Sequence, residues 1–127
     1  MCIRDSAGYP DAQLEPLAVE WDYGDYEGIS SDLIRKDNPE YLIWTHGVPN
    51  GEALDDVAAR ADKIVARVLE SGLDNVLIVA HGHFSRILTA RWLGLDPREG
   101  RHFVLGTAKV CTLGWDKKTP AIVRWGL

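Results

Sequence analysis

The pattern of apolar and polar positions predicts helices that alternate with strands. The clearest helix follows Gly51, where apolar residues recur at helical spacing and form one stripe that ends at Ser71-Gly72. The apolar run over residues 76–80 predicts a buried strand, and a second helical pattern extends from about residue 84 to residue 93. Helix, strand, helix and strand in this order indicate a βαβ-type sheet that is covered on both faces.

Shorter patterns complete the prediction. Residues 16–20 predict a strand that ends at Glu20, and residues 31–36 predict a short helix that Asn38-Pro39 stops. Three strands are expected near the C-terminus, with a turn before the last one. They cover residues 103–105, 109–115 and 121–125, and the turn covers residues 117–120.

Composition narrows the class of protein. A chain of 127 residues is long enough for one domain, and 46% apolar with 26% charged residues is ordinary for a soluble globular protein. A net charge of −5 without a basic run argues against nucleic acid or an anionic membrane as partner. No apolar run has the length of a membrane span. Two cysteines at opposite ends favour the reducing cytoplasm over a disulfide framework.

The most informative chemistry follows the strand predicted over residues 76–80. It ends in His81 and Gly82, directly before the second helix. Ligands of α/β proteins bind outside the carboxyl ends of parallel strands, and a helix N-terminus suits an anion such as phosphate. His81 is therefore our candidate for stabilising a phosphoryl group, and Gly82 would let the backbone approach it. His83 would line the same mouth or lie on the surface.

A second candidate is the acidic segment over residues 20–28, which interleaves four carboxylates with three aromatic residues. An aromatic neighbour can desolvate a carboxylate and suit it to general acid catalysis. Glu20 stands at a predicted strand end, as His81 does, so we expect the two to face one crevice. The alternative is a solvated acidic turn.

The loop that precedes the long helix is a third candidate. It contains Trp44 and His46, and it would form a lid or a specificity wall, or a helix entry with Asn50 as the cap. Within the helix, Asp56 and Arg60 stand four residues apart, a spacing that allows an ion pair.

A metal site is the alternative role for the two neighbouring histidines. The spacing of His81 and His83 occurs in some zinc sites, but such a site needs further ligands, such as His46, His102 or a carboxylate. The chain offers no cysteine pair for that purpose, so we expect no metal.

Three motifs together resemble the histidine phosphatase superfamily, which has a phosphoglycerate mutase-like fold. They are residues 20–28 (Glu-Trp-Asp-Tyr-Gly-Asp-Tyr-Glu-Gly), Gly51-Glu52, and residues 80–86 (Ala-His-Gly-His-Phe-Ser-Arg). The similarity extends from about Ala7 to the C-terminus. The stretch Trp44-Thr45-His46-Gly47 points to the bacterial acid phosphatase and sugar-bisphosphatase-like branch. The resemblance implies an α/β fold, a three-layer αβα sandwich.

The resemblance also implies a mechanism on small phosphorylated metabolites without any cofactor. A histidine in an Arg-His-Gly motif attacks phosphorus, and arginines clamp the phosphate. A second histidine, which His81 matches, stabilises the transferred group. An acidic residue, which Glu20 matches, protonates the leaving oxygen and then activates water. Gly82 and His83 would line the phosphate or substrate mouth, and Trp44 with His46 would shape specificity.

The chain departs from this pattern because no histidine in it follows an arginine and precedes a glycine. We therefore expect the fold without its N-terminal strand and helix. We interpret residues 1–6 as a non-native leader and residues 7–127 as a single partial domain, inactive alone as a phosphatase. The alternatives are a non-catalytic anion-binding or interaction module and, less favoured, a metal-dependent hydrolase. Lys109 would reach the phosphate mouth or be solvated, and the sequence does not specify an oligomeric state.

Overall fold

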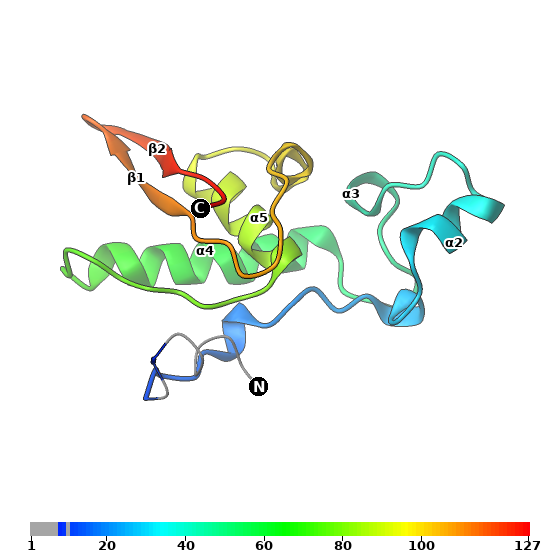
Figure 1. Ribbon diagram of the computed structural model, residues 1–127, viewed down its shortest axis with the longest axis horizontal. Helices are drawn as coiled ribbons and strands as arrows, with labels where there is room; N and C mark the ends of the chain where they lie inside the picture. The colour runs from blue at the N-terminus through cyan, green and yellow to red at the C-terminus, as the bar shows by residue number, and fades with distance from the viewer. Residues whose placement is uncertain (1–7, 10) are drawn as a thin grey trace.

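Two packed helices organise the molecule. The computed structural model describes residues 8, 9 and 11–127, so the leader predicted over residues 1–6 lies outside the described residues. Helix α4 (Leu54–Glu70) packs against α5 (Gly82–Trp92), as Figure 1 shows in green and yellow-green. Buried side chains from both helices and from the segments before them form one core: Trp21, Trp44, Leu54, Val57, Ala58, Ala61, Ile64, Phe84, Ile87 and Leu88.

Both long helices are confirmed, with local reasons for their ends. In α4 the apolar stripe faces the core, acidic residues occupy the first turn, and Arg67 lies in the last. The cap predicted at Asn50 is wrong, because the N-cap is Ala53 and the Asn50 side chain donates to Asp25 at 2.8 Å. Helix α5 begins slightly before the predicted start, since the extended backbone of His81 forms its N-cap.

Short helical turns take up much of the remaining chain. A hydroxyl cap from Ser30 begins α2 (Ser31–Asp37), which confirms the short helix. The strand predicted over residues 16–20 is wrong. The Pro16–Ala18 part is the 3-10 helix η1, because Pro16 suits a first helical position and Glu15 accepts from the Leu17 N–H. The other short elements are η2 (Gly24–Tyr26), α3 (Ile43–His46) and η3 (Pro97–His102).

A hairpin near the C-terminus covers part of α5. Strands β1 (Thr112–Asp116) and β2 (Thr119–Arg124) pair antiparallel, and Lys117 has the positive φ of 56° that suits a tight turn. The Trp92 indole N–H donates to the Gly114 carbonyl at 3.0 Å, which ties the hairpin to the helix. The last two predicted strands are thus confirmed with shifted ends, whereas residues 103–105 form no strand.

The apolar segment over residues 76–80 is not a strand. The sheet found in the described residues has two strands only, so the predicted βαβ sheet with two covered faces is wrong for this part of the chain. The segment runs back along α4 (Figure 1). Ile78 and Ala80 pack on the core, whereas Val76, Leu77 and Val79 are exposed. One face is therefore covered and the other open, and its backbone has no partner strand among the described residues.

Candidate active site

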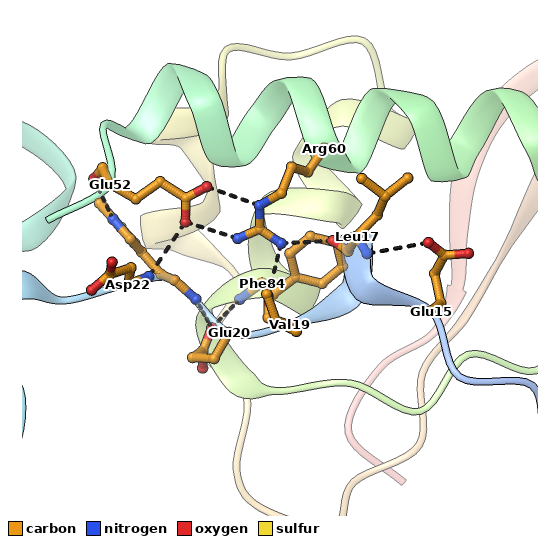
Figure 2. Close-up of polar contacts among 9 residues, drawn as sticks. Glu15, Leu17, Val19, Glu20, Asp22, Glu52, Arg60 and Phe84 are labelled. Carbon is orange, nitrogen blue, oxygen red and sulfur yellow. Dashed lines mark hydrogen bonds and ion pairs between the residues drawn. The ribbon is translucent and has the colours of Figure 1, made fainter.

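Glu20 meets the start of α5. Its Oε1 accepts from the backbone N–H of Phe84 at 2.8 Å (Figure 2) and from that of Trp21 at 3.0 Å. Its Oε2 accepts from the backbone N–H of His83 at 3.2 Å. His81 is the residue that begins this helix. The structure therefore brings Glu20 to the end of α5 that His81 caps. That the two side chains face one crevice stays a prediction.

The helix N-terminus already holds an anion, and that anion is the protein's own carboxylate. The N–H groups of His83 and Phe84 are among those that the helix cannot satisfy itself, and both donate to Glu20. The His81 side chain is exposed and, within the described part of the chain, makes no hydrogen bond or ion pair. These two N–H groups are therefore occupied by the Glu20 carboxylate.

Arg60 fixes the chain on both sides of Glu20. Its Nε donates to Glu52 Oε2 at 2.8 Å and its Nη2 to Glu52 Oε1 at 2.9 Å, a two-pronged pair. Its Nη1 donates to the carbonyls of Leu17 at 2.6 Å and Val19 at 2.9 Å (Figure 2). The ion pair predicted with Asp56 is absent, since the guanidinium turns to Glu52 across the loop.

Glu52 holds the segment that follows Glu20. The Trp21 indole N–H donates to the Glu52 carbonyl at 2.7 Å, and the Glu52 N–H donates to the Asp22 carbonyl at 2.9 Å. The Arg60 guanidinium also lies 5.2 Å from the centroid of the Phe84 ring. Arg60 and Glu52 therefore clamp the Glu20 segment onto α4 and α5, a role that sequence reasoning missed.

The motifs over residues 20–28 and 51–52 touch each other through glycine. A Cβ placed on Gly24 would lie 2.3 Å from the Pro49 carbonyl oxygen, and one on Gly51 would lie 2.6 Å from the Asp22 carbonyl oxygen. The Asp25 N–H donates to Pro49 at 2.9 Å within the same contact. Only glycine allows this approach, so the backbone of the acidic segment is packed against residues 49–51. The side chains of Asp22, Asp25 and Glu27 are nevertheless exposed, as in the solvated turn.

His83 lies in an aromatic cluster. Its ring centroid lies 6.0 Å from that of Trp21, 5.6 Å from that of Tyr23 and 5.5 Å from that of Trp44. The Tyr23 hydroxyl hydrogen-bonds to His83 Nδ1 at 2.6 Å. Burial lowers the pKa of His83, although the nearby Glu20 charge acts in the opposite direction. Burial, and then the charge of Glu20, raises the pKa of Tyr23. Burial therefore favours the neutral form of His83, whose ring lies among the aromatic side chains and whose backbone N–H donates to Glu20.

Trp44 and His46 lie in different environments. Trp44 is buried in the core, and the Arg86 guanidinium lies 4.9 Å from its ring centroid. Its role as a lid or a specificity wall stays a prediction. His46 is exposed, and its Nδ1 lies 3.0 Å from the Thr45 hydroxyl. Lys109 is also exposed and lies beside Gly106. Gly82, at the first position of α5, has open space around it.

The described residues offer no assembled metal centre. In residues 8, 9 and 11–127, no three His, Cys, Asp or Glu side chains gather so as to hold an ion. The Tyr23 hydroxyl is hydrogen-bonded to His83 Nδ1. Among the described residues, no further His, Cys, Asp or Glu side chain completes a zinc site with His81 and His83. Nor does this part of the chain contain a helix long and apolar enough to cross a bilayer.

Comparison with known proteins identifies the class. The profile of the histidine phosphatase superfamily (branch 1) matches residues 2–127. An acid phosphatase of Mycobacterium tuberculosis is 41% identical over 122 residues, which are 95% of this chain and 60% of the relative. A sedoheptulose 1,7-bisphosphatase of Saccharomyces cerevisiae is 32% identical over 97 residues, 63% of this chain and 35% of the relative. The chain belongs to the histidine phosphatase superfamily.

Solved structures agree. The structure of an open reading frame product from Mycobacterium tuberculosis superposes with a TM-score of 0.91 at 40% identity, covering 98% of this chain and 65% of that one. A mycobacterial glucosyl-3-phosphoglycerate phosphatase in complex with VO3 gives a TM-score of 0.78 at 25% identity, covering 98% and 67%. The α/β, phosphoglycerate mutase-like fold is thereby confirmed, and the chain spans about 60% of the curated acid phosphatase.

Proposed function

We propose that this chain is the acid-donating and phosphoryl-stabilising part of a phosphohistidine-type phosphatase for small phosphorylated metabolites. The observation that carries the proposal is the meeting of Glu20 with the first turn of α5, directly after the exposed His81. Superfamily membership and relatives named as phosphatases support phosphoric monoester hydrolysis as the reaction.

Each group has a defined part in this proposal. His81 donates to a phosphoryl oxygen and offsets the negative charge that develops during transfer. Glu20 gives a proton to the leaving oxygen and later takes one from the attacking water. Gly82 leaves room for the phosphate. His83 positions the Glu20 carboxylate through its backbone N–H, while its ring packs in the aromatic cluster.

The nucleophile is the part that this chain does not supply. Transfer through a covalent intermediate needs a histidine placed in line with the leaving oxygen. None of the four histidines lies between an arginine and a glycine. His102 is the one that follows an arginine, Arg101, and it precedes Phe103. We infer that the chain alone binds phosphate without hydrolysing its esters. A cytoplasmic location follows from the cysteine content and is part of the same proposal.

Vanadate binding tests the site directly. Orthovanadate, a phosphate analogue, is titrated into 15N- and 13C-labelled chain while the NMR signals of the His81 ring and of the first turn of α5 are followed. We expect saturable shifts at these positions that inorganic phosphate reproduces at higher concentration. In His81→Ala, affinity should fall by about tenfold, the loss expected for one charge-assisted hydrogen bond.

His102→Ala is the matched control, since His102 is exposed, lies in η3 and has its Nε2 3.4 Å from the Glu99 carboxylate. It should bind vanadate as the parent chain does. Equal loss in both variants, or no binding in the parent, would contradict the phosphate site. Steady hydrolysis of a phosphate ester by the purified chain would contradict the inferred lack of a nucleophile.

A further inference from the structure

A preformed hollow adjoins Glu20 on the side of His83. It has a volume of about 300 Å³ and lies between the η2 turn, α2 and α3. Its lining includes the tyrosines Tyr23, Tyr26 and Tyr41, the apolar side chains of Ile34 and Ile43, and the ring of His83. His83 therefore connects Glu20 with the hollow. Its backbone N–H donates to the Glu20 carboxylate, and its ring forms a wall of the hollow.

The walls of the hollow are fixed before any ligand arrives. The Tyr23 hydroxyl is bonded to His83 at 2.6 Å, and the Tyr41 hydroxyl donates to the Gly47 carbonyl at 2.8 Å. Tyr26 and Tyr41 meet edge to face with their centroids 5.5 Å apart. Rigid aromatic walls bind flat apolar groups with little loss of side-chain entropy.

The charges around the hollow exclude a second anionic group. Its lining contains the Glu27 carboxylate and, among the described residues, no lysine or arginine. The only titratable base in that lining is His83, whose pKa burial lowers. Two arginines lie outside the lining but close to it. Arg35 donates to the Tyr41 carbonyl at 3.1 Å and is partly offset by Asp32, 3.8 Å away. Arg86, whose charge acts on Tyr23 and His83, lies over the Trp44 ring. Among the described residues, a second phosphate or a carboxylate would lose its water there beside Glu27 without touching a lysine or arginine of the lining.

We propose that this hollow holds the uncharged, aromatic or apolar leaving group of the phosphomonoester whose phosphate lies beside His81 and Glu20. This rests on the proposed function and adds the substrate class. The site selects monoesters of apolar alcohols or phenols against sugar bisphosphates and phosphorylated acids. Contact with the tyrosine side chains favours the apolar leaving group, and repulsion by Glu27 disfavours a second anionic group.

The experiment compares four probes on the intact chain: inorganic phosphate, phenyl phosphate, glycerol 3-phosphate and fructose 1,6-bisphosphate. Dissociation constants are measured by NMR titration at the first turn of α5. We expect phenyl phosphate to bind at least about tenfold more tightly than inorganic phosphate, which is the gain from enclosing one ring. The bisphosphate should bind no more tightly than glycerol 3-phosphate.

A matched pair of variants on α2 makes the test specific. Ile34 lines the hollow, whereas the adjacent Leu33 does not and is 53% exposed. Ile34→Lys should remove the preference for phenyl phosphate and improve bisphosphate binding by about tenfold through the new cation. Leu33→Lys should change neither. The ratio of two dissociation constants is the readout, and thermal unfolding by circular dichroism verifies that both variants fold.

The failure of this inference is distinguishable from that of the phosphate site. If phosphate binds and responds to His81→Ala while phenyl phosphate shows no advantage, the leaving-group assignment is wrong and the phosphate site stands. An equal effect of Ile34→Lys and Leu33→Lys also overturns the assignment. If none of the four probes binds, both proposals fall together.

Discussion

The first turn of α5 and the apolar segment directly before it differ sharply, although they are neighbours in the sequence. Phe84 and Ile87 in the helix are 0% exposed, whereas Leu77 in the segment is 60% exposed. The helix start is held by Glu20, by the core and by the Arg60 contact. Residues 76–80 touch the core on one face only.

The difference follows from how the two structures satisfy their backbones. A helix makes its hydrogen bonds within its own residues, so a correct apolar stripe and a good cap are sufficient locally. A strand needs neighbours on its edges, and no described segment pairs with residues 76–80. The same apolar content therefore gives a buried helix in one place and a half-covered extended segment in the other.

The largest expected effect is the loss of the Phe84 ring. Phe84→Ala should destabilise the chain by about 3–4 kcal/mol, because it removes a fully enclosed ring and leaves a cavity under Arg60. Urea unfolding followed by tryptophan fluorescence measures the change. Leu77→Ala is the comparison from the open segment and should cost much less than Phe84→Ala. Similar losses for the two variants would show that the open face is covered in solution.

The next effect concerns the clamp on the Glu20 segment. Arg60→Met keeps the length of the side chain but leaves Glu52 and the carbonyls of Leu17 and Val19 without their donor. Arg60 and Glu52 are 16% and 18% exposed, so water replaces the lost bonds poorly. We expect a loss of about 2 kcal/mol in urea unfolding.

Arg67→Met is the control for the clamp. Arg67 lies on the same helix and pairs with Glu15, but its side chain is 54% exposed. Its removal should cost less than that of Arg60, because exposed pairs contribute little. If the two variants lose the same stability, the clamp is an ordinary surface pair. A selective loss of the Glu20 to Phe84 contact in Arg60→Met, seen by amide exchange, would support the positioning role.

The helices and the pairing of motifs could be predicted because their signals are local or ordered along the chain. The apolar stripe of α4 needs only its own residues, and the motifs at Glu20 and His81 indicate one site without giving its geometry. The hairpin was also predictable, since its two strands are adjacent.

The clamp and the aromatic cluster could not be predicted in this way. Helical spacing pointed to Asp56 as the partner of Arg60, whereas the pairing with Glu52 depends on the path of the loop that precedes α4. His83 is surrounded by Trp21, Tyr23 and Trp44, which lie far from it in the sequence, so no local pattern indicates that their rings meet. Residues 76–80 were misassigned for a related reason, because apolar content does not specify whether neighbouring strands are present.

Mild acid should weaken the fold through His83. Burial lowers the pKa of His83, and the groups that face it are Glu20, Arg86 and Tyr23. The unfolded chain takes up a proton near the ordinary histidine pKa of about 6.5, before the folded chain does. The contribution of neutral His83 is therefore present above that pH and is lost as the pH falls toward the lower, folded pKa.

The effect is measured as the difference between the urea unfolding midpoints at about pH 7.5 and about pH 5.5, for the parent chain and for a variant without the titrating ring. His83→Gln keeps a group that can bond to the Tyr23 hydroxyl but removes the titration. The fall in stability between the two pH values should be smaller in His83→Gln than in the parent chain. An equal fall in both proteins would show that folding does not lower the pKa of His83.

The smallest change in stability is expected on the open face, and it separates the two sides of one segment. Leu77→Lys should alter unfolding by no more than about 0.5 kcal/mol, because Leu77 is 60% exposed. It should also reduce self-association measured by sedimentation velocity, since an exposed apolar segment with unpaired backbone attracts other chains. Ile78→Lys, one residue further, places a charge against the core and should cost far more. If both lysines are equally costly, residues 76–80 are enclosed on both faces, and the contrast with α5 disappears.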